Sequence, residues 1–555
     1  MTVSPAPSPR TVAATEADAL WAAGDAIGAV AAYARALSSD PGDALSAMNL
    51  AHALAACGNA DGALQWMRYA HAIDPADPVL EMNLGAIHHG RGEIDEASAC
   101  YARALERRPD YGEAWLNYGN AALYSGDADT AVARFDRALQ SGPHLDKALA
   151  NIVYALSYAA NASPAEIRRR AEEWDRRFAL PRVAPGLAFA DRDPRRPLRI
   201  GYVSPDLANH PIGHFMVGVL AHHSRDRFDV TVYSERPVED DLSARMKKDA
   251  SAWHKTAGMS DAALIAQIVG DRIDILVDLA GHTSGNRLRV FSAKPAPVQL
   301  TWMGSVGTTG LSAMDGLIAD RFHVPAGCET GYVERVFRLP NSFLSFTPVE
   351  QAPAVGPPPV LRNGYVTFGC FSNPAKINPP LIQAWAEILR RTPGSRLRLQ
   401  YRWMNSSLNR SRLETGFAAY GIGRDRLSIE GEAGHAQLLA AYNEIDIAFD
   451  TSPYSGGATT LEALWMGAPV VTWPQARFAS RHAYSFLSVL GLDRLIAYDL
   501  AGYIDTACRL AVDLETLQGL RSTLRNLLRR SPLCDTEGFT GDLEGLYREA
   551  WTTFR

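Results

Sequence analysis

The segment IDIAFDTSPYSGGATTLEALWMGAPVV (445–471) decides the fold of the second half of the chain. An apolar run ends at Asp450, two glycines follow, and a helical pattern begins with Ala458, Thr459 and Thr460. The order strand, tight turn and helix is typical of a parallel sheet covered by helices. We therefore expect an α/β fold around this segment.

The start of the expected helix is suited to bind an anion. The first N–H groups of a helix have no partner within it, and the helix dipole is positive at that end. Gly457 would let a diphosphate approach the backbone closely, and Glu462 would accept hydrogen bonds from ribose hydroxyls. A helix capped by threonine is also common without any nucleotide, so the pattern alone leaves both interpretations open.

The same alternation of strand and helix recurs on both sides of this segment. Apolar runs that predict strands are LRIGYVS, FDVTVYS, IDILVDL, PVQLTW, YVTFGCF, RLRLQY and APVVTW. Because a proline-rich stretch interrupts the alternation at 349–364, we expect two Rossmann-like domains at 198–348 and 365–500, followed by C-terminal helices at 501–555. Ligands of open parallel sheets bind at the carboxyl ends of the strands, so we expect a site in the cleft that the two domains face.

The first part of the chain has a period of 34 residues. The repeated positions are Pro41, Pro75, Pro109 and Pro143; Gly24, Gly58, Gly92 and Gly126; Ala29, Ala63, Ala97 and Ala131; and Ala36, Ala70, Ala104 and Ala138. Each unit predicts two amphipathic helices, with the glycine ending the first and the proline following the second. The pattern resembles an α-helical superhelix of tetratricopeptide repeats over 13–160. We expect a helical linker at 161–197 and a disordered N-terminus at 1–12.

One repeated register is polar, with Asn49, Asn83, Asn117 and Asn151 spaced 34 residues apart. An amide has both a donor and an acceptor, so a row of them can bind the backbone of an extended peptide. The alternative is that each amide only bonds to the adjacent repeat. Both interpretations stay open, and the four asparagines are our candidate acceptor-binding residues.

Composition excludes several classes of protein. The 555 residues are 47% hydrophobic and carry a formal charge of -6, so neither a largely disordered chain nor a nucleic-acid partner is expected. The six cysteines form no CxxC pair and indicate reduced thiols. Because no signal-peptide pattern and no run of about 18 apolar residues occurs, we expect a cytoplasmic protein without a membrane partner.

Two further segments carry groups suited to catalysis. In CFSNPAKINP (370–379), Lys376 follows a strand and would neutralise phosphate charge as a leaving group departs. His210, His214 and His282 follow strand ends of the first sheet domain and would act as a base, bind a sugar or phosphate, or be purely structural. The tight acidic pairs of the sequence lie elsewhere, so we expect metal-independent chemistry and no cofactor.

Three motifs, GHTSGNRLRVFSAKPAPVQLTWMGSVGTTGL (281–311), FSNPAKINP (371–379) and PYSGGATTLEALWMGAPVV (453–471), follow the repeats in this order. Together they resemble the O-linked N-acetylglucosaminyltransferase family, in which tetratricopeptide repeats precede a family 41 glycosyltransferase of the GT-B type, here in a compact, bacterial-like form. The resemblance implies inverting, metal-independent transfer of N-acetylglucosamine from UDP-N-acetylglucosamine to Ser or Thr hydroxyls of proteins. Related enzymes use GDP-fucose, so protein O-fucosylation is an alternative. A homodimer is kept as an option for the assembly.

The resemblance also implies residue roles. His210 matches a histidine proposed as the base and close to donor and acceptor, and Lys376 matches the lysine that stabilises the UDP leaving group. The remaining implied donor-binding residues are Gly304, Asn373, His435, Gly457, Ala458, Thr459, Thr460 and Glu462. The proton acceptor is left open between His210, the donor phosphate and an aspartate such as Asp271 or Asp274.

The sequence departs from the family pattern near the expected sugar and diphosphate. Ser305 and Val306 replace Tyr-Pro, Ala458 stands where Thr is common, and Ala375 replaces an aromatic residue. These changes motivate a third alternative, a weakly active peptide-binding scaffold that retains nucleotide binding.

Overall fold

The computed structural model describes residues 12–142, 145–183, 196–304, 306–349 and 351–554. Residues 1–11, where we expected disorder, and residues 184–195 of the expected linker lie outside the described residues. Val12, the last residue of the expected disordered stretch, begins a helix. The chain forms two compact units. One contains the residues up to Ser125 with Ala133–Leu145 and Ser406–Asn409, and the other contains Gly126–Val132, Asp146–Asn405 and Arg410–Arg555.

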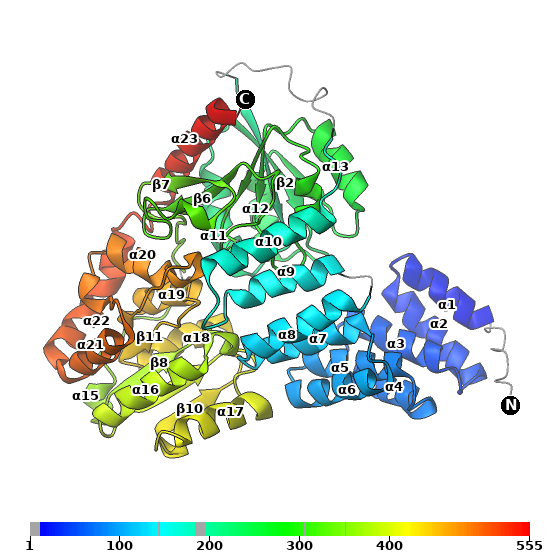
Figure 1. Ribbon diagram of the computed structural model, residues 1–555, viewed down its shortest axis with the longest axis horizontal. Coiled ribbons are helices and arrows are strands. Elements are labelled where there is room, and N and C mark those ends of the chain that lie inside the picture. Colours follow the sequence, from blue (N-terminus) through cyan, green and yellow to red (C-terminus); the bar gives the residue numbers. More distant parts are fainter. Residues whose placement is uncertain (1–11, 143–144, 184–195, 305, 350, 555) are drawn as a thin grey trace. The chain divides into compact units, whose positions relative to one another are not determined.

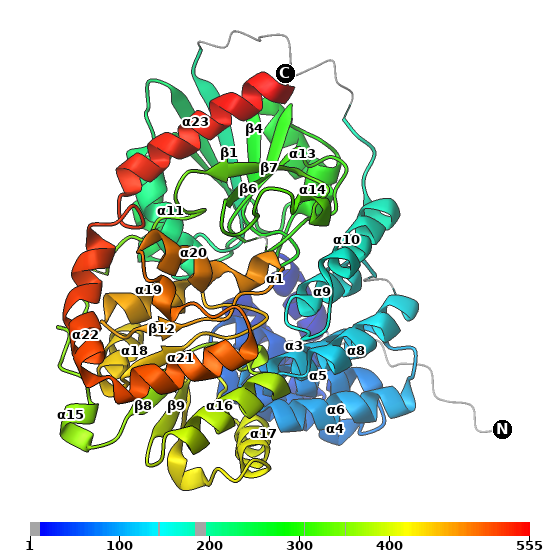
Figure 2. The same cartoon turned by 60° about the vertical axis from the view of Figure 1, so that its left-hand side comes forward.

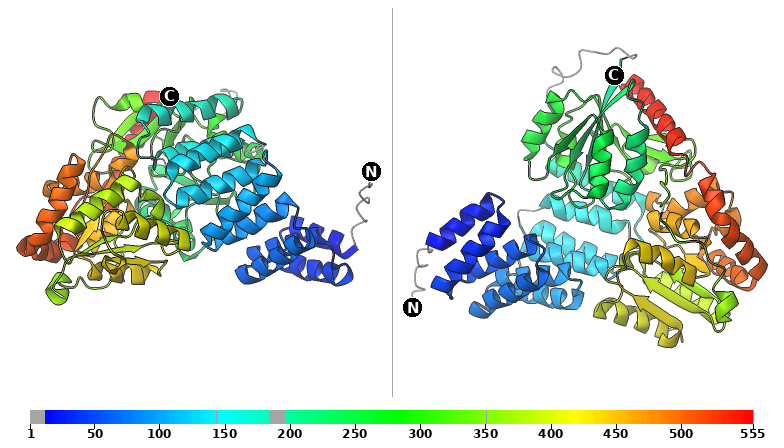
Figure 3. Two further views of the ribbon diagram at one scale, coloured as in Figure 1. Left: turned by 60° about the horizontal axis from the view of Figure 1, so that its bottom comes forward. Right: turned by 180° about the vertical axis from the view of Figure 1, so that it is seen from behind.

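The period of 34 residues corresponds to helix pairs, as predicted. The helices are α1 (Val12–Ala22), α2 (Ala26–Ser39), α3 (Ala44–Ala56), α4 (Ala60–Ile73), α5 (Pro78–Gly90), α6 (Ile94–Arg107), α7 (Gly112–Tyr124) and α8 (Ala128–Gln140). Pairing of α1 with α2, α3 with α4 and α5 with α6 can be followed in Figure 3. Gly24, Gly58 and Gly92 follow the first helix of each pair at φ of +81°, +79° and +78°, a left-handed conformation that glycine adopts without strain.

The first sheet domain contains seven parallel strands in the order β3-β2-β1-β4-β5-β6-β7. The strands are β1 (Leu198–Ser204), β2 (Phe228–Ser234), β3 (Ala252–Lys255), β4 (Ile275–Asp278), β5 (Val298–Thr301), β6 (Gly316–Asp320) and β7 (Arg335–Leu339). Its helices are α11 (Pro211–His222), α12 (Asp241–Asp249), α13 (Asp261–Gly270) and α14 (Leu288–Ser292). Helices and strands of this domain are green to cyan in Figure 1.

The second sheet domain contains five parallel strands in the order β10-β9-β8-β11-β12. The strands are β8 (Thr367–Cys370), β9 (Arg396–Gln400), β10 (Leu427–Glu430), β11 (Ile447–Phe449) and β12 (Val470–Val471). Its helices are α15 (Val360–Asn363), α16 (Pro379–Arg391), α17 (Ser407–Ala418), α18 (His435–Ala441), α19 (Ala458–Trp465) and α20 (His482–Val489). The predicted α/β fold with two parallel sheets is therefore correct.

The C-terminal helices divide between the two sheet domains. Helices α21 (Leu500–Val512) and α22 (Leu514–Arg529) pack on α16 and α19 of the second domain. The last helix, α23 (Thr536–Phe554), returns to the first domain and packs against α11, β5 and β7, as Figure 2 shows in red. There, Tyr547 and Tyr202 place their hydroxyls 2.9 Å apart, and Glu544 accepts a hydrogen bond from His223.

Two helices lie between the repeats and the first strand. They are α9 (Leu145–Leu156) and α10 (Pro164–Phe178), and both belong to the unit that contains the two sheets. Arg168 of α10 donates to the carbonyls of Thr330 and Tyr332 in the first sheet domain, so this helix packs on that domain. In the part of the chain that the structure describes, no helix is long and apolar enough to cross a membrane.

Candidate active site

The turn before α19 is organised by a buried carboxylate. Asp450 follows β11 and accepts hydrogen bonds from the Gly456 amide (2.7 Å), the Ser455 hydroxyl (2.7 Å) and the Thr472 hydroxyl (2.6 Å). Burial raises the pKa of Asp450, and these donors oppose that effect. The carboxylate therefore fixes the shape of the turn that leads into the helix.

Helix α19 begins at Ala458, as predicted, and it does not have the threonine cap of the alternative interpretation. Gly457 is the N-cap and provides no side-chain hydrogen bond to the helix. Thr459 and Thr460 lie in the first turn, and with Asp450 they line a small hollow beneath it. Because no side chain caps the helix, its first amides can bind an anionic ligand.

Lys376 reaches the same turn from the other side. It ends a short 3-10 turn (Pro374–Lys376), and its Nζ donates to the Ser455 carbonyl at 2.9 Å and lies 4.1 Å from the centre of the Tyr454 ring. Burial lowers the pKa of Lys376 to about 8, while the charge of Asp450 opposes that shift. The sequence pointed to Lys376 but not to Tyr454 or Asp450, which hold it in place.

Asn373 starts the same short turn. Its side-chain oxygen accepts the Ala375 amide at 3.0 Å, so it shapes the backbone that leads to Lys376. Gly304 lies in the first sheet domain, where a Cβ atom would come within 2.0 Å of the Leu279 carbonyl oxygen, so only glycine fits. Ser305, one of the departures from the family pattern, lies outside the described residues.

Glu462 and His435 form a pair at the edge of the second domain. His435 Nε2 donates to Glu462 Oε1 at 2.8 Å, and this hydrogen bond raises the pKa of His435. His214, on α11 of the first domain, has its ring centre 5.9 Å from that of His435. Burial and the nearby His435 lower the pKa of His214. The two sheet domains thus meet beside the turn that holds Lys376 and the start of α19.

His210 is the N-cap of α11. Its Nδ1 accepts the Ile212 amide at 3.3 Å and lies 3.9 Å from Asp206 Oδ1. Burial lowers the pKa of His210, and Asp206 opposes that effect. An imidazole whose Nδ1 accepts a hydrogen bond carries its proton on Nε2, so Nε2 of this ring can donate a hydrogen bond.

The other expected proton acceptors are excluded by their surroundings. His282 is buried, its Nε2 donates to the Thr309 carbonyl at 2.8 Å, and burial lowers its pKa to about 4, so it is a structural residue. Asp271 and Asp274 precede β4 and therefore lie at the amino end of the sheet, opposite the cleft. Asp274 is also bound by the Arg196 guanidinium at 2.6 Å, so the structure disfavours the aspartates among the proton acceptors that the sequence left open.

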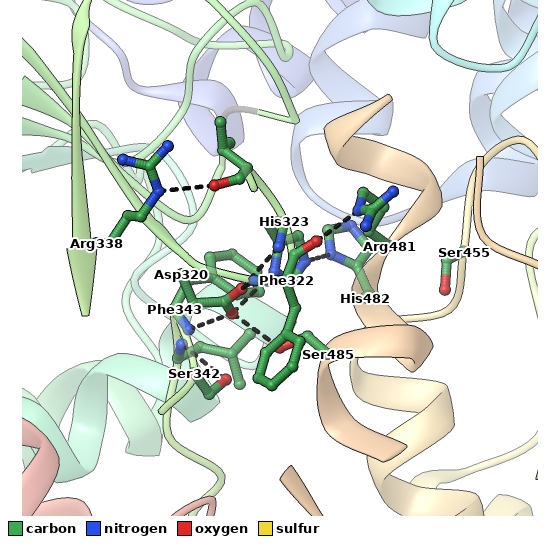
Figure 4. A network of polar contacts seen from close by, with 12 residues as sticks. Asp320, Phe322, His323, Arg338, Ser342, Phe343, Ser455, Arg481, His482 and Ser485 are labelled. Atoms are coloured by element: carbon green, nitrogen blue, oxygen red, sulfur yellow. Dashed lines mark hydrogen bonds and ion pairs between the residues drawn. The ribbon is translucent and has the colours of Figure 1, made fainter. Parts of the chain in front are cut away.

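A polar network that the sequence analysis missed joins the two sheet domains. Asp320, at the end of β6, accepts from His323 Nδ1 (2.9 Å) and from the Ser485 hydroxyl (2.8 Å). His323 Nε2 lies 2.9 Å from Nδ1 of His482 at the start of α20, and Figure 4 shows this connection. Arg481 donates to the Phe322 carbonyl across the same boundary. A histidine directly after a strand, the same signal that selected His210, would have indicated His323.

The asparagine register lies on the first helix of each pair, as expected. Asn49 Nδ2 donates to Asp18 Oδ1 (3.5 Å), Asn83 Nδ2 to Met48 Sδ (3.2 Å) and Asn117 Nδ2 to Met82 Sδ (3.3 Å). Each of these bonds joins neighbouring repeats. All three side chains, and that of Asn151 on α9, are only partly buried, so peptide binding stays a prediction.

The described residues contain no group of three or more His, Cys, Asp or Glu side chains that could hold a metal ion. Lys376 and Asp450 contact the turn before α19, and Glu462 of α19 is bound by His435. An uncapped helix start and a partly buried lysine at the carboxyl edge of the second parallel sheet thus form a candidate diphosphate site in an α/β protein.

The comparisons with known proteins assign the chain to a family. Residues 185–347 and 360–543 match the model of glycosyl transferase family 41, and residues 15–78 and 85–165 match a tetratricopeptide repeat model. The chain belongs to glycosyl transferase family 41. The predicted resemblance and the predicted repeats are thereby confirmed.

Two named relatives and one solved structure show the same relationship. The chain is 38% identical over 392 residues to a tomato (Solanum lycopersicum) protein named probable UDP-N-acetylglucosamine–peptide N-acetylglucosaminyltransferase SPINDLY, a match covering 69% of this chain and 42% of the relative. It is 31% identical to the SEC protein of the same description from Arabidopsis thaliana, over 68% of this chain and 39% of the relative. A mutant O-GlcNAc transferase of Thermobaculum terrenum superimposes with a TM-score of 0.86 at 35% identity, covering 92% of this chain and 97% of that chain. The chain thus spans about two fifths of these plant relatives, and its GT-B architecture is shared with the bacterial enzyme.

Proposed function

We propose that the protein is an inverting, metal-independent O-glycosyltransferase that moves N-acetylglucosamine from UDP-N-acetylglucosamine to Ser or Thr hydroxyls of proteins. In this reaction the acceptor oxygen attacks the anomeric carbon as the bond from that carbon to the diphosphate breaks. UDP leaves with the electron pair, and the hydroxyl proton is transferred to a base. Family membership and the names of the relatives support the donor and the class of acceptor.

The position of Lys376 is the observation that carries the proposal. Its ammonium group lies on the turn that precedes the uncapped start of α19, so both positive elements can act on one diphosphate. The charge on UDP increases as the sugar bond breaks, and both groups stabilise that charge more in the transition state than in the ground state. In this proposal they do the work that a divalent cation does in other nucleotide-sugar enzymes.

His210 orients the donor in this proposal. With its Nδ1 engaged by the Ile212 amide, Nε2 donates a hydrogen bond to a sugar or phosphate oxygen. The acceptor proton then goes to an oxygen of the donor diphosphate, since Asp271 and Asp274 lie at the opposite edge of the sheet. Glu462, held by His435, would bind the ribose hydroxyls, while Asn373 and Gly304 would shape the backbone near the donor.

The repeats would supply the acceptor site. Asn49, Asn83, Asn117 and Asn151 would bind the backbone of an extended acceptor segment, which makes the enzyme tolerant of acceptor sequence. A cytoplasmic location belongs to the same proposal and is supported by six free cysteines.

Calorimetric titration with UDP, GDP and UDP-N-acetylglucosamine tests the donor. The wild type and Lys376→Gln are compared in buffer with EDTA, and transfer to a pool of Ser- and Thr-containing peptides is followed by mass spectrometry. We expect UDP to bind to the wild type, binding to weaken in the variant, and EDTA to leave transfer unchanged. Tighter binding of GDP than of UDP would favour GDP-fucose as the donor in place of UDP-N-acetylglucosamine. Nucleotide binding without any transfer would favour the scaffold alternative, and loss of transfer in EDTA would contradict metal independence.

A further inference from the structure

Tyr454 connects Lys376 to a segment that precedes both sheet domains in the sequence. One contact of its ring is with the Lys376 ammonium group, 4.1 Å from the ring centre. A second is with the ring of Tyr158, whose centre lies 4.6 Å away at an interplanar angle of 31°. His482 contacts Tyr454 edge-on at 6.0 Å. The ring that supports the lysine is therefore held by residues of distant segments.

Tyr158 lies in the turn that ends α9, and this turn is fixed to the second sheet domain. Arg477 donates to the carbonyls of Leu156 (3.2 Å), Ala159 (2.6 Å) and Ala160 (2.8 Å), on both sides of Tyr158. The Arg477 side chain is buried, and so is Tyr158, with 4% of its surface exposed. A buried guanidinium bound to three carbonyls leaves this turn little freedom to move.

The same helix carries the last asparagine of the repeated register. Asn151, Tyr154 and Tyr158 are separated by three and four residues, the spacing that places side chains along one face of a helix and its terminal turn. The hydroxyls of Tyr154 and Tyr158 lie 2.6 Å apart. One face of α9 thus leads from a candidate acceptor-binding residue to the ring that covers Tyr454.

We propose that Tyr158 is a positioning residue of the transferase, which acts through the Tyr454 ring to hold the Lys376 ammonium group against the donor diphosphate. The proposal rests on the function proposed above. In this proposal the end of α9 is a part of the donor site and does more than support the repeats. A movement of α9 would displace the Tyr454 ring that packs on Lys376. A segment that begins next to the acceptor-binding register would then control how well the leaving group is stabilised.

The physical consequence can be measured on the lysine itself. Several groups face it: Asp450 and Cys370 at strand ends, Tyr454 beside it, and His482 on α20. Removing the Tyr158 ring leaves these charges in place but lets Tyr454 shift and water reach Nζ. We expect the pKa of Lys376 to rise toward that of an ordinary lysine, since burial is what lowers it.

The test compares Tyr158→Leu with Tyr158→Phe in the full chain. Leucine keeps most of the buried volume without an aromatic face, and phenylalanine keeps the face without the hydroxyl. We expect kcat to fall about three- to tenfold in Tyr158→Leu, the range that one aromatic pair contributes, with little change in KM for the donor. Tyr158→Phe should retain wild-type kcat. Tyr154→Phe is the matched control, because it removes the same hydroxyl contact and leaves the Tyr158 ring on Tyr454.

A second readout does not depend on transfer. Lys376 is labelled with fluorodinitrobenzene at graded pH, and the extent of labelling is read by peptide mass spectrometry. Tyr158→Leu should shift the labelling profile to higher pH, and the two phenylalanine variants should not. If the wild type transfers no sugar, the proposed function fails, but the labelling profile still tests the link between Tyr158 and Lys376. A wild-type profile in Tyr158→Leu, or an equal shift in Tyr158→Phe, would overturn the proposal.

Discussion

Replacing Lys376 by glutamine should make the protein more stable. The folded protein lowers the pKa of this lysine from 10.5 to about 8, which corresponds to about 3 kcal/mol at about 1.4 kcal/mol per pKa unit. Below pH 8 the folded state carries this charge in a partly buried site, whereas the unfolded chain carries it in water. Glutamine has no charge to bury and can still donate to the Ser455 carbonyl. We therefore expect Lys376→Gln to raise the free energy of unfolding by about 1–3 kcal/mol at pH 7.

The pH dependence tests the cause. The folded lysine loses its proton near pH 8 and the unfolded lysine near 10.5, so the unfolded state binds more protons between these values and the wild type gains stability as pH rises. The advantage of Lys376→Gln in urea unfolding should therefore shrink between pH 7 and 9. Lys255→Gln is the control, because that side chain is 58% exposed and its loss should change stability by less than about 1 kcal/mol. Equal or lower stability of Lys376→Gln at pH 7 would refute the reasoning.

Three further predictions concern other parts of the molecule. His210→Asn replaces the capping Nδ1 by an amide oxygen, so α11 keeps its N-cap, and we expect kcat to fall about tenfold with an unchanged dependence of kcat on pH. Loss of a pH dependence that the wild type shows would make His210 the base. Asp320→Asn should lower the free energy of unfolding by about 2 kcal/mol at pH 7, because the folded protein lowers the pKa of Asp320 from 3.8 to about 2. That contribution is present above pH 4 and is lost as pH falls toward 2. The free energies of unfolding of the wild type and the variant, plotted against pH, should therefore converge near pH 2. A constant difference between them across this range would exclude the charge as the cause. Asn117→Ala should raise KM for a peptide acceptor about fivefold, because one hydrogen bond to the acceptor is lost. The Kd for UDP, measured by calorimetry, should not change. An unchanged KM would assign the amide to packing between repeats.

The fold could be predicted from the sequence where one local pattern decided the structure. The helix end at Gly58 and the strand at Leu198–Ser204 each depend on neighbours in sequence, and both were predicted at their positions. The strand β3 (Ala252–Lys255) was missed because AWHK is a short edge strand without a continuous apolar run. The return of α23 to the first domain was also missed, since a contact across more than 300 residues leaves no local pattern.

The site was predicted to the extent that its residues follow strand ends. Lys376 and Glu462 were selected on that basis, and the structure brings both to the turn and helix start that follow β11. Their supports, such as Tyr454, were not selected, because a ring that packs on a lysine has no distinguishing spacing in sequence. Asp274 had been left open as a proton acceptor, and the parallel pairing of β1 with β4 places it at the amino edge of the sheet, away from the strand ends that face the cleft.

The return of α23 to the first sheet domain sets an order for biosynthesis. A ribosome releases β1 long before it has made Tyr547 and Glu544, so Tyr202 and His223 leave the exit tunnel without the partners that later bury them. The first sheet domain is therefore translated before the second but completed after it. Nascent chains stalled before residue 536 would expose the surface of α11 and β7 that α23 covers, and they would need a chaperone to stay soluble.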